Sequence, residues 1–257
     1  LEKSLKLGPA DVKAWLDESL EKDTLSVSVV GDVDKTAILE QLKQTFGALP
    51  KRRASRRAYT EERSLSFPAK GTKKVFTYET TIPKAMAFVC WDAPDMWDIS
   101  RTRRISLLSR VLDDKLRVRL REQEAKTYSP YAGSNLSDTY NDYGFIFARV
   151  LTEPRSADEL AQEVLDIAEL LKEEGVTADE LERAKKPTLE QLKEWVRNNR
   201  YWLNNVMLSC REHPQRLQWA RTMQEDYASI TATEVSALAK RYLIPDNAVQ
   251  VLIKPED

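Results

Sequence analysis

An amphipathic segment between two pairs of strand-like runs constrains the fold of this chain more than any other feature. In ISRTRRISLLSRVLDDKLRVRLRE, residues 99–122, apolar side chains recur at helical spacing, and arginine and aspartate occupy the opposite face. The recurring residues are Ile105, Leu108, Leu112 and Leu116. A helix with one apolar face must bury that face against another element. The spacing therefore predicts a long helix over 99–122 with one face in the core.

Strand-like runs flank this helix on both sides. KKVFTYET at 73–80 and AMAFVCWDAP at 85–94 precede it, and the second run is apolar enough for a central strand. After it, TYSPYAGSNLS at 127–137 and YGFIFARVLTE at 143–153 pair as a hairpin around the polar turn DTYND. AVQVLIKP at 248–255 predicts a last strand. Paired strands followed by helices predict an α+β fold with a largely antiparallel sheet packed on one face by helices.

The ends of further elements can also be predicted. LSVSVVGD at 25–32 predicts a buried strand that ends at Gly31, and Asp34 predicts the start of a helix over 35–46. Gly175 predicts the end of a helix, and Pro187 predicts the start of a helix or a kink. Three pairs have the spacing of a capping box, in which a hydroxyl and a carboxylate satisfy first-turn amides: Ser156 with Glu159, Thr177 with Glu180, and Thr231 with Glu234.

Length and composition indicate one globular domain. With 257 residues and 42% apolar content, the chain can bury a sizeable core. We expect a single domain over 1–257 with a charged connector at 51–64, and a fragment of a longer chain because it opens at Leu1 rather than methionine. Lys plus Arg total 40 against 41 for Asp plus Glu, so no overall charge attracts nucleic acid or an acidic membrane surface.

The residues that usually build catalytic centres are scarce. The chain has one histidine, His213, so it cannot build a zinc site with two histidines. Cys90 and Cys210 lack CxxC spacing, which predicts two free thiols. The neighbouring Asp113 and Asp114 are expected to be solvated helix acids rather than a metal site. From these residues alone, no catalytic centre can be identified.

Arg121 and Tyr128 stand seven residues apart in LREQEAKTYSPYAG, residues 120–133, where the predicted helix ends and a strand begins. Two ordinary roles would account for them. An arginine at a helix C-terminus interacts favourably with the helix dipole, and a strand tyrosine packs against cross-strand neighbours. A functional role for the pair needs support from elsewhere in the chain.

Three longer stretches provide that support. VSVVGDVDKTAILEQLKQTFGALP, LLSRVLDDKLRVRLREQEAKTYSP and EEGVTADELERAKKP occur in this order along the chain. They resemble landmarks of the pitrilysin/insulinase family of zinc metallopeptidases. The resemblance runs from about residue 10 to the final VLIKP and is to one C-terminal domain of that family. TYSP and NNRYWLNN are most similar to its large bacterial members, which are described as periplasmic zinc proteases.

The resemblance implies a fold, a cofactor and partners. The fold is that of the mitochondrial-processing-peptidase-like metallohydrolase domains, and two homologous halves close like a clamshell around a chamber. Zinc is bound by an H-x-x-E-H helix in the other half, so this segment itself binds no cofactor or metal. The expected partners are that N-terminal zinc-binding half, in the same protein or in a partner subunit, and a peptide substrate, with no nucleic acid and no membrane. The expected compartment is the periplasm.

The resemblance also gives Arg121 and Tyr128 catalytic roles. The family pattern is like L-R-E-x-x-G-x-x-Y-S, and Leu120, Arg121, Glu122, Tyr128 and Ser129 match it, while Ala125 replaces the usual glycine. A phenol O–H aimed at the reacting carbonyl oxygen stabilises the oxyanion, which is the role implied for Tyr128. The guanidinium of Arg121 would hold peptide carbonyls in register. The alternative is a non-catalytic scaffold or binding subunit of the same fold.

Overall fold

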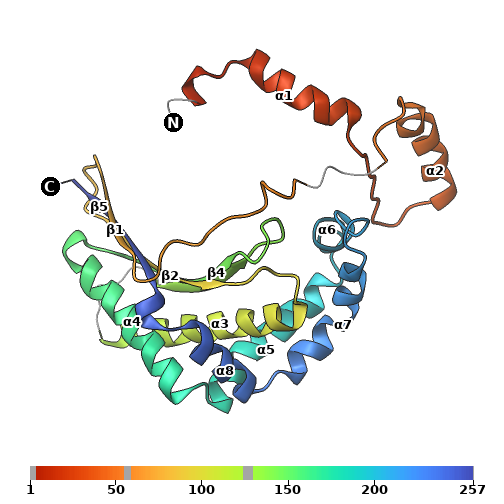
Figure 1. Cartoon of the computed structure of the whole chain (residues 1–257). Helices are drawn as coiled ribbons and strands as arrows, with labels where there is room; N and C mark the ends of the chain where they lie inside the picture. The colour runs from red at the N-terminus through yellow and green to blue at the C-terminus, as the bar shows by residue number, and fades with distance from the viewer. Residues whose placement is uncertain (1–3, 55–58, 124–129, 257) are drawn as a thin grey trace. The chain divides into compact units, whose positions relative to one another are not determined.

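The computed structural model of the chain describes residues 4–54, 59–123 and 130–256 (Figure 1). Its contacts divide the chain into two compact units. Unit 1 comprises Leu1–Thr60 and Trp195–Ala220, and unit 2 comprises Glu61–Glu194 and Arg221–Asp257. Because the chain passes between the units three times, unit 1 interrupts unit 2 in sequence. The single domain over 1–257 remains a prediction.

Unit 2 is built on a five-stranded sheet with the order β1-β5-β2-β4-β3. The strands are β1 (Lys73–Tyr78), β2 (Ala85–Ala93), β3 (Tyr131–Leu136), β4 (Gly144–Thr152) and β5 (Val249–Pro255). β1 and β5 run parallel, and the other three neighbouring pairs run antiparallel. The predicted hairpin is confirmed, since β3 and β4 pair directly. The largely antiparallel sheet is therefore confirmed as well.

Helices cover one face of this sheet, as predicted (Figure 1). The helices in contact with strands are α3 (Ile99–Gln123), α4 (Ala157–Glu174) and α8 (Ala232–Tyr242). Alternate residues of β2 lie under them, and all four residues of the predicted α3 stripe are fully buried. They are Ile105, Leu108, Leu112 and Leu116. α5 (Ala178–Trp195) and α7 (Gln215–Ser229) also lie mostly in unit 2.

Two of the three predicted capping boxes are present, at Thr177 and at Thr231. The third is wrong, because the Ser156 side chain makes no capping hydrogen bond. Ser156 lies in a 3-10 turn with helical backbone angles, whereas a capping residue is normally extended. Gly175 ends α4 with a positive φ of 78°, as predicted. Pro187 lies inside α5 and does not start a new helix.

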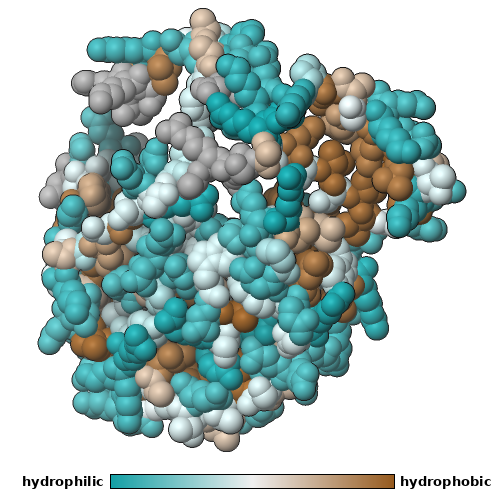
Figure 2. Space-filling model, turned by 45° about the vertical axis from the view of Figure 1, so that its right-hand side comes forward, coloured by the Kyte–Doolittle hydropathy of each residue, from teal (hydrophilic) through white to brown (hydrophobic). Residues whose placement is uncertain are grey.

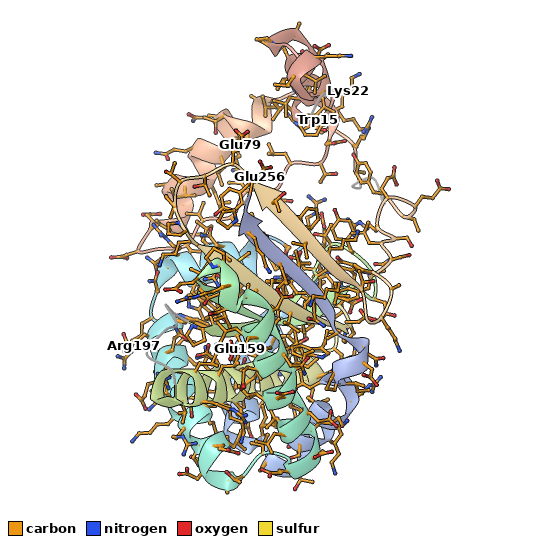
Figure 3. All side chains as sticks on the ribbon, turned by 90° about the vertical axis from the view of Figure 1, so that its left-hand side faces the viewer. Trp15, Lys22, Glu79, Glu159, Arg197 and Glu256 are labelled. Carbon is orange, nitrogen blue, oxygen red and sulfur yellow. The ribbon has the colours of Figure 1, made fainter. Side chains whose placement is uncertain are left out.

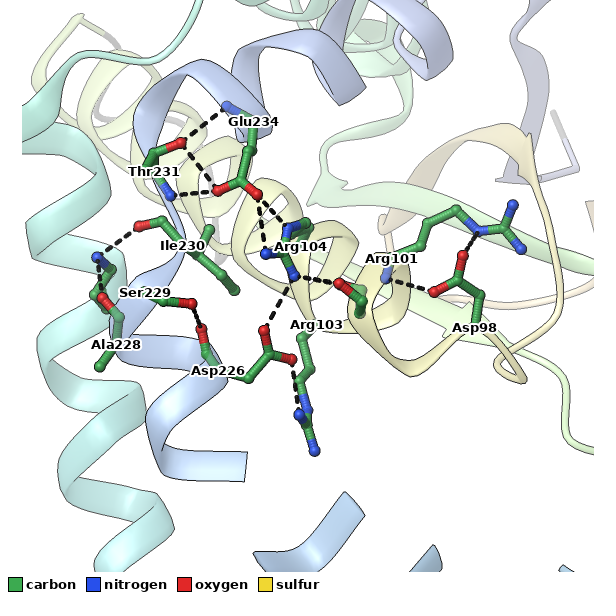
Figure 4. A network of polar contacts seen from close by, with 12 residues as sticks. Asp98, Arg101, Arg103, Arg104, Asp226, Ala228, Ser229, Ile230, Thr231 and Glu234 are labelled. Carbon is green, nitrogen blue, oxygen red and sulfur yellow. Dashed lines mark hydrogen bonds and ion pairs between the residues drawn. The ribbon is translucent and has the colours of Figure 1, made fainter. Parts of the chain in front are cut away.

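A cluster of ion pairs joins α3 to the last two helices of unit 2 (Figure 4). Arg103 and Arg104 both donate to Asp226 on α7, at 2.7 Å and 3.2 Å. Arg104 also pairs with Glu234 on α8 at 2.9 Å. Arg103 is buried and Arg104 is largely shielded from solvent, whereas the Glu234 side chain is 40% exposed, so the cluster runs from the interior of unit 2 to its surface.

Unit 1 contains α1 (Pro9–Lys22), α2 (Lys35–Gln44), a short helix α6 (Asn199–Tyr201) and a π-helical turn over Trp202–Met207. The Asp34 carboxylate accepts hydrogen bonds from two first-turn amides, so the predicted start of α2 is confirmed. The strand predicted over 25–32 is wrong: the segment is irregular, and Val27 and Val29 are exposed. A β-strand needs a neighbouring strand, and none pairs with this segment in the described part of unit 1.

Figure 2 shows hydrophobic side chains gathered at the upper right of the molecule, over the part of unit 1 that includes α2. Within residues 4–54, 59–123 and 130–256, no helix is long and apolar enough to cross a membrane.

Candidate functional site

The two predicted catalytic residues lie at and beyond the end of α3. Arg121 is in the last turn of this helix, although its side chain is not among those described. Tyr128 lies outside the described residues. Their catalytic roles therefore remain predictions. The structure does place the two ends of the connection, with Leu120 buried in the core and Tyr131 opening β3.

Asp113 fixes β3 to α3. Its Oδ1 atom accepts a hydrogen bond of 2.8 Å from the backbone amide of Ala132, at the start of β3. β3 is an edge strand, so this carboxylate satisfies an amide of the edge. The prediction that Asp113 is a solvated helix acid is wrong, because its carboxylate accepts a hydrogen bond from the strand. The contact ties the start of β3, at the far end of the connection that carries Tyr128, to α3.

The neighbouring Asp114 is also engaged. Partial burial opposes its ionisation, but hydrogen bonds from Arg117 and Arg183 outweigh that effect and hold the pKa of the Asp114 carboxyl below its usual range. Arg183 lies on α5, with its Nε atom 3.1 Å from Asp114 Oδ2. In the parts of the chain that the structure describes, no group of three or more His, Cys, Asp or Glu side chains could hold a metal ion.

The face of the sheet away from the helices carries an aromatic cluster beside β3. Phe88 of β2 stacks on Phe147 of β4, with ring centroids 5.4 Å apart. Phe145 and Tyr131 flank Phe147 at 5.8 Å each. These rings are only partly covered, whereas the alternate residues of the same strands are buried under the helices. We call Phe88, Tyr131, Phe145 and Phe147 the aromatic face.

Arg149 adds a positive charge to the aromatic face. Its guanidinium carbon lies 5.1 Å from the centroid of the Tyr131 ring, which is the geometry of a cation–π interaction. In the sheet register, Arg149 stands between Phe88 and Tyr131. The side chain is exposed. An apolar surface with an exposed guanidinium can bind an extended peptide through its side chains and its carbonyl or carboxylate oxygens.

A cysteine on the same face does not offer a nucleophile. Cys90 is buried, and desolvation raises the pKa of its thiol to about 11. Because the thiolate is the reactive form, this thiol is inert at neutral pH. Both Cys90 and Cys210 are free, as predicted.

The sequence predicts roles for Arg121 and Tyr128, which stay predictions, but it does not point to Asp113 or to the aromatic face as a binding surface. Asp113 had no local signal, because its partner amide is 19 residues away in the chain. The aromatic face had a partial signal, since Phe88 in AMAFVCWDA lies between buried residues and Phe145 and Phe147 alternate with buried residues in GFIFARVLT. That alternation indicates which residues share a face, but not that helices leave this face open.

Comparison with known proteins gives one family and many similar folds. The family described as the peptidase M16 inactive domain matches residues 6–187. No curated protein sequence matches the chain. Among solved structures, the periplasmic protease PqqL from Escherichia coli is 16% identical with a TM-score of 0.69, over 88% of this chain and 25% of that one.

Two other solved structures are similar to more of the chain. A protease from Helicobacter pylori is 16% identical with a TM-score of 0.79, over 98% of this chain and 60% of that one. The ferredoxin protease FusC, solved in complex with Arabidopsis ferredoxin, is 16% identical with a TM-score of 0.74, over 100% of this chain and 28% of that one. At this identity the likeness shows the fold alone, and the chain spans 25% to 60% of the length of these relatives.

Proposed function

Because the chain belongs to the peptidase M16 family, through its inactive C-terminal domain, we propose that it is the substrate-holding part of a zinc-dependent endopeptidase. The observation that carries the proposal is the junction of α3 and β3. The connection between these two elements follows Arg121 in the sequence and includes Tyr128. At its far end, Asp113 anchors the start of β3, where Tyr131 of the aromatic face also lies.

The proposed chemistry divides between two parts of the enzyme. When bound by the other half, zinc would supply Lewis-acid activation of the attacking water. Tyr128 donates a hydrogen bond from its phenol O–H to the substrate carbonyl oxygen as negative charge develops on that oxygen. This hydrogen bond lowers the activation barrier most where bulk water is excluded. Arg121 donates to neighbouring peptide carbonyls and keeps the scissile bond in position. Neither role requires a metal ligand in this chain.

The aromatic face would support the same peptide. Peptide side chains can pack on Phe88 and Phe147, while the exposed guanidinium of Arg149 binds a carbonyl or carboxylate oxygen. β3 is the edge strand on this side of the sheet. The surface therefore adjoins the connection that carries Tyr128, and binding there would hold the substrate near it.

The proposed partner is a zinc-binding half carried by the same protein or by a second subunit. The relatives support this, since the chain spans only 25% of PqqL and 28% of FusC. The complex of FusC with ferredoxin supports a protein-derived substrate for this chain too. The likeness to PqqL, described as periplasmic, supports a periplasmic location.

A metal analysis of the purified chain 1–257 tests this division. We expect far less than one zinc per chain after dialysis, and no cleavage of an unstructured peptide, because a single histidine cannot complete a peptidase zinc site. Elemental analysis by mass spectrometry gives the stoichiometry. Tight one-to-one zinc binding together with chelator-sensitive hydrolysis would show that the catalytic centre lies in this chain after all.

A further inference from the structure

β1 forms one edge of the sheet in unit 2, and among the described elements it packs mainly on its neighbour β5. All six of its residues are exposed. Val75, Phe76 and Tyr78 are 54%, 53% and 40% exposed. The opposite edge differs, because β3 packs against α3 and one of its amides donates to Asp113. An exposed and largely apolar edge strand is a template for pairing with another strand.

The backbone groups along the outer side of β1 belong to alternate residues. The carbonyl groups of Thr72 and Tyr78 accept hydrogen bonds from amides in and just after β5, so these residues face β5. In a parallel pair, every second residue directs its amide and its carbonyl toward the neighbouring strand. The backbone groups of Val75 and Thr77 therefore point outward, where no strand of the described residues lies.

The sequence of this edge, KKVFTYE at 73–79, is complementary to itself when it is read in the opposite direction. In an antiparallel pair of two copies centred on Phe76, each Lys73 stands opposite a Glu79 of the other copy. The two Phe76 side chains stand opposite each other. Opposite charges and paired aromatic rings are cross-strand pairs that stabilise antiparallel strands.

The charges of this edge lie at its two ends. Figure 3 labels Glu79 and Glu256 at the same end of the neighbouring strands β1 and β5, and the exposed Lys73 and Lys74 begin β1 at the other end. Lys73 also pairs with Asp158 of α4 at 2.9 Å, and its side chain is 47% exposed. Lysines spread along an edge oppose pairing, but here the residues between the two ends carry no charge. Antiparallel pairing brings the acidic end of each copy to the basic end of the other.

The side chains of β1 also continue a face of the sheet. Lys74 is in register with Val251 of β5, and Val251 is in register with Phe88 of β2. Lys74, Phe76 and Tyr78 therefore lie on the same face as Phe88, away from the helices. In the antiparallel pair, each Lys74 would stand opposite the Tyr78 ring of the other copy, which is a position for a cation–π interaction.

We infer that the edge of β1 is the interface of a homodimer, in which two copies of this protein pair their β1 strands antiparallel about a twofold axis at Phe76. The outward backbone groups of Val75 in one copy then bond to those of Thr77 in the other, and the two sheets become one. Because each copy contributes a single strand, the contact is smaller than a standard interface, and we expect a reversible dimer in the micromolar range.

Sedimentation equilibrium of the full-length protein from about 1 to about 300 µM tests the inference. We expect a dimer that dissociates on dilution. Glu79→Lys should raise the dissociation constant about tenfold, because the twofold axis places two lysine pairs opposite each other. Glu256→Lys makes the same charge change one strand further from the interface and should change the constant little. A monomer over the whole range, or equal effects of the two variants, would overturn the inference.

Two cysteine variants of the full-length protein test the register. In Phe76→Cys, two thiols meet at the twofold axis, where opposite Cα atoms are about 4.5 Å apart and a disulfide can form. Mild oxidation should therefore give a covalent dimer. In Val75→Cys, the two cysteines are displaced along the strands and lie beyond the reach of a disulfide. The unmodified protein, oxidised alongside, shows the yield from its other cysteines. Equal yields from both variants, or no gain over the unmodified protein, would contradict the proposed pairing.

Discussion

Replacing Tyr128 with phenylalanine should lower kcat of the full-length protein by about two orders of magnitude or more, while zinc content and Tm stay nearly unchanged. Phenylalanine keeps the ring and its packing and removes only the O–H group. A packing tyrosine therefore predicts little kinetic change, and an oxyanion donor predicts a large one. Steady-state hydrolysis of an unstructured peptide, with metal analysis of the same samples, measures the difference.

Tyr140→Phe is the matched control. Tyr140 lies in the turn between β3 and β4, where its ring meets Tyr143 edge-on at a centroid distance of 6.0 Å. The change removes the same O–H group at the opposite end of β3, so kcat should be close to that of the unmodified protein. A Tyr128→Phe variant with normal turnover would contradict the oxyanion role and favour a non-catalytic scaffold.

Replacing Asp226 with alanine should destabilise unit 2 by about 3 kcal/mol. The change removes the carboxylate shared by Arg103, which is buried, and Arg104 (Figure 4). This loss lies at the lower end of the range for buried ion pairs, because 21% of the Asp226 side chain is exposed. Denaturant unfolding followed by far-ultraviolet circular dichroism measures the loss.

Two further variants separate burial from charge. Glu190→Ala removes an exposed partner, 2.7 Å from Lys193, and should leave the free energy of unfolding nearly unchanged. Arg103→Met combined with Asp226→Leu should recover much of the stability, because the buried Arg103 charge is removed with its partner and Arg104 keeps Glu234. Equal losses for Asp226→Ala and Glu190→Ala would show that the buried cluster contributes no more than a surface pair.

Much of unit 2 could be predicted from the sequence because the deciding interactions are local. The buried stripe of α3 repeats within a few residues, and the β3–β4 hairpin is set by two strands around a short polar turn. The Thr231–Glu234 capping box also lies within one helical turn. In each of these three cases, the spacing of residues close together in the sequence is enough to predict the helix stripe, hairpin or cap.

The remaining features depend on residues far apart in the sequence. The valine pattern at 25–30 indicates a segment suited to a sheet, but it does not reveal whether a neighbouring strand is present. The contact between Asp113 and Ala132 depends on how α3 meets the sheet edge. Ser156 has the right spacing for a cap, but the preceding 3-10 turn gives it the wrong backbone conformation. None of these could be read from local spacing.

A cleavage assay on separated parts of the full-length protein tests the proposed role of this domain most directly. The proposed zinc-binding half, expected to carry H-x-x-E-H, is loaded with zinc and assayed alone, with added 1–257, and with added 1–257 bearing Tyr128→Phe. We predict little cleavage of an unstructured peptide by the zinc-bearing part alone, a large gain with 1–257, and almost no gain with the variant. Full activity of the zinc-bearing part alone, unchanged by adding 1–257, would contradict a catalytic role for this domain.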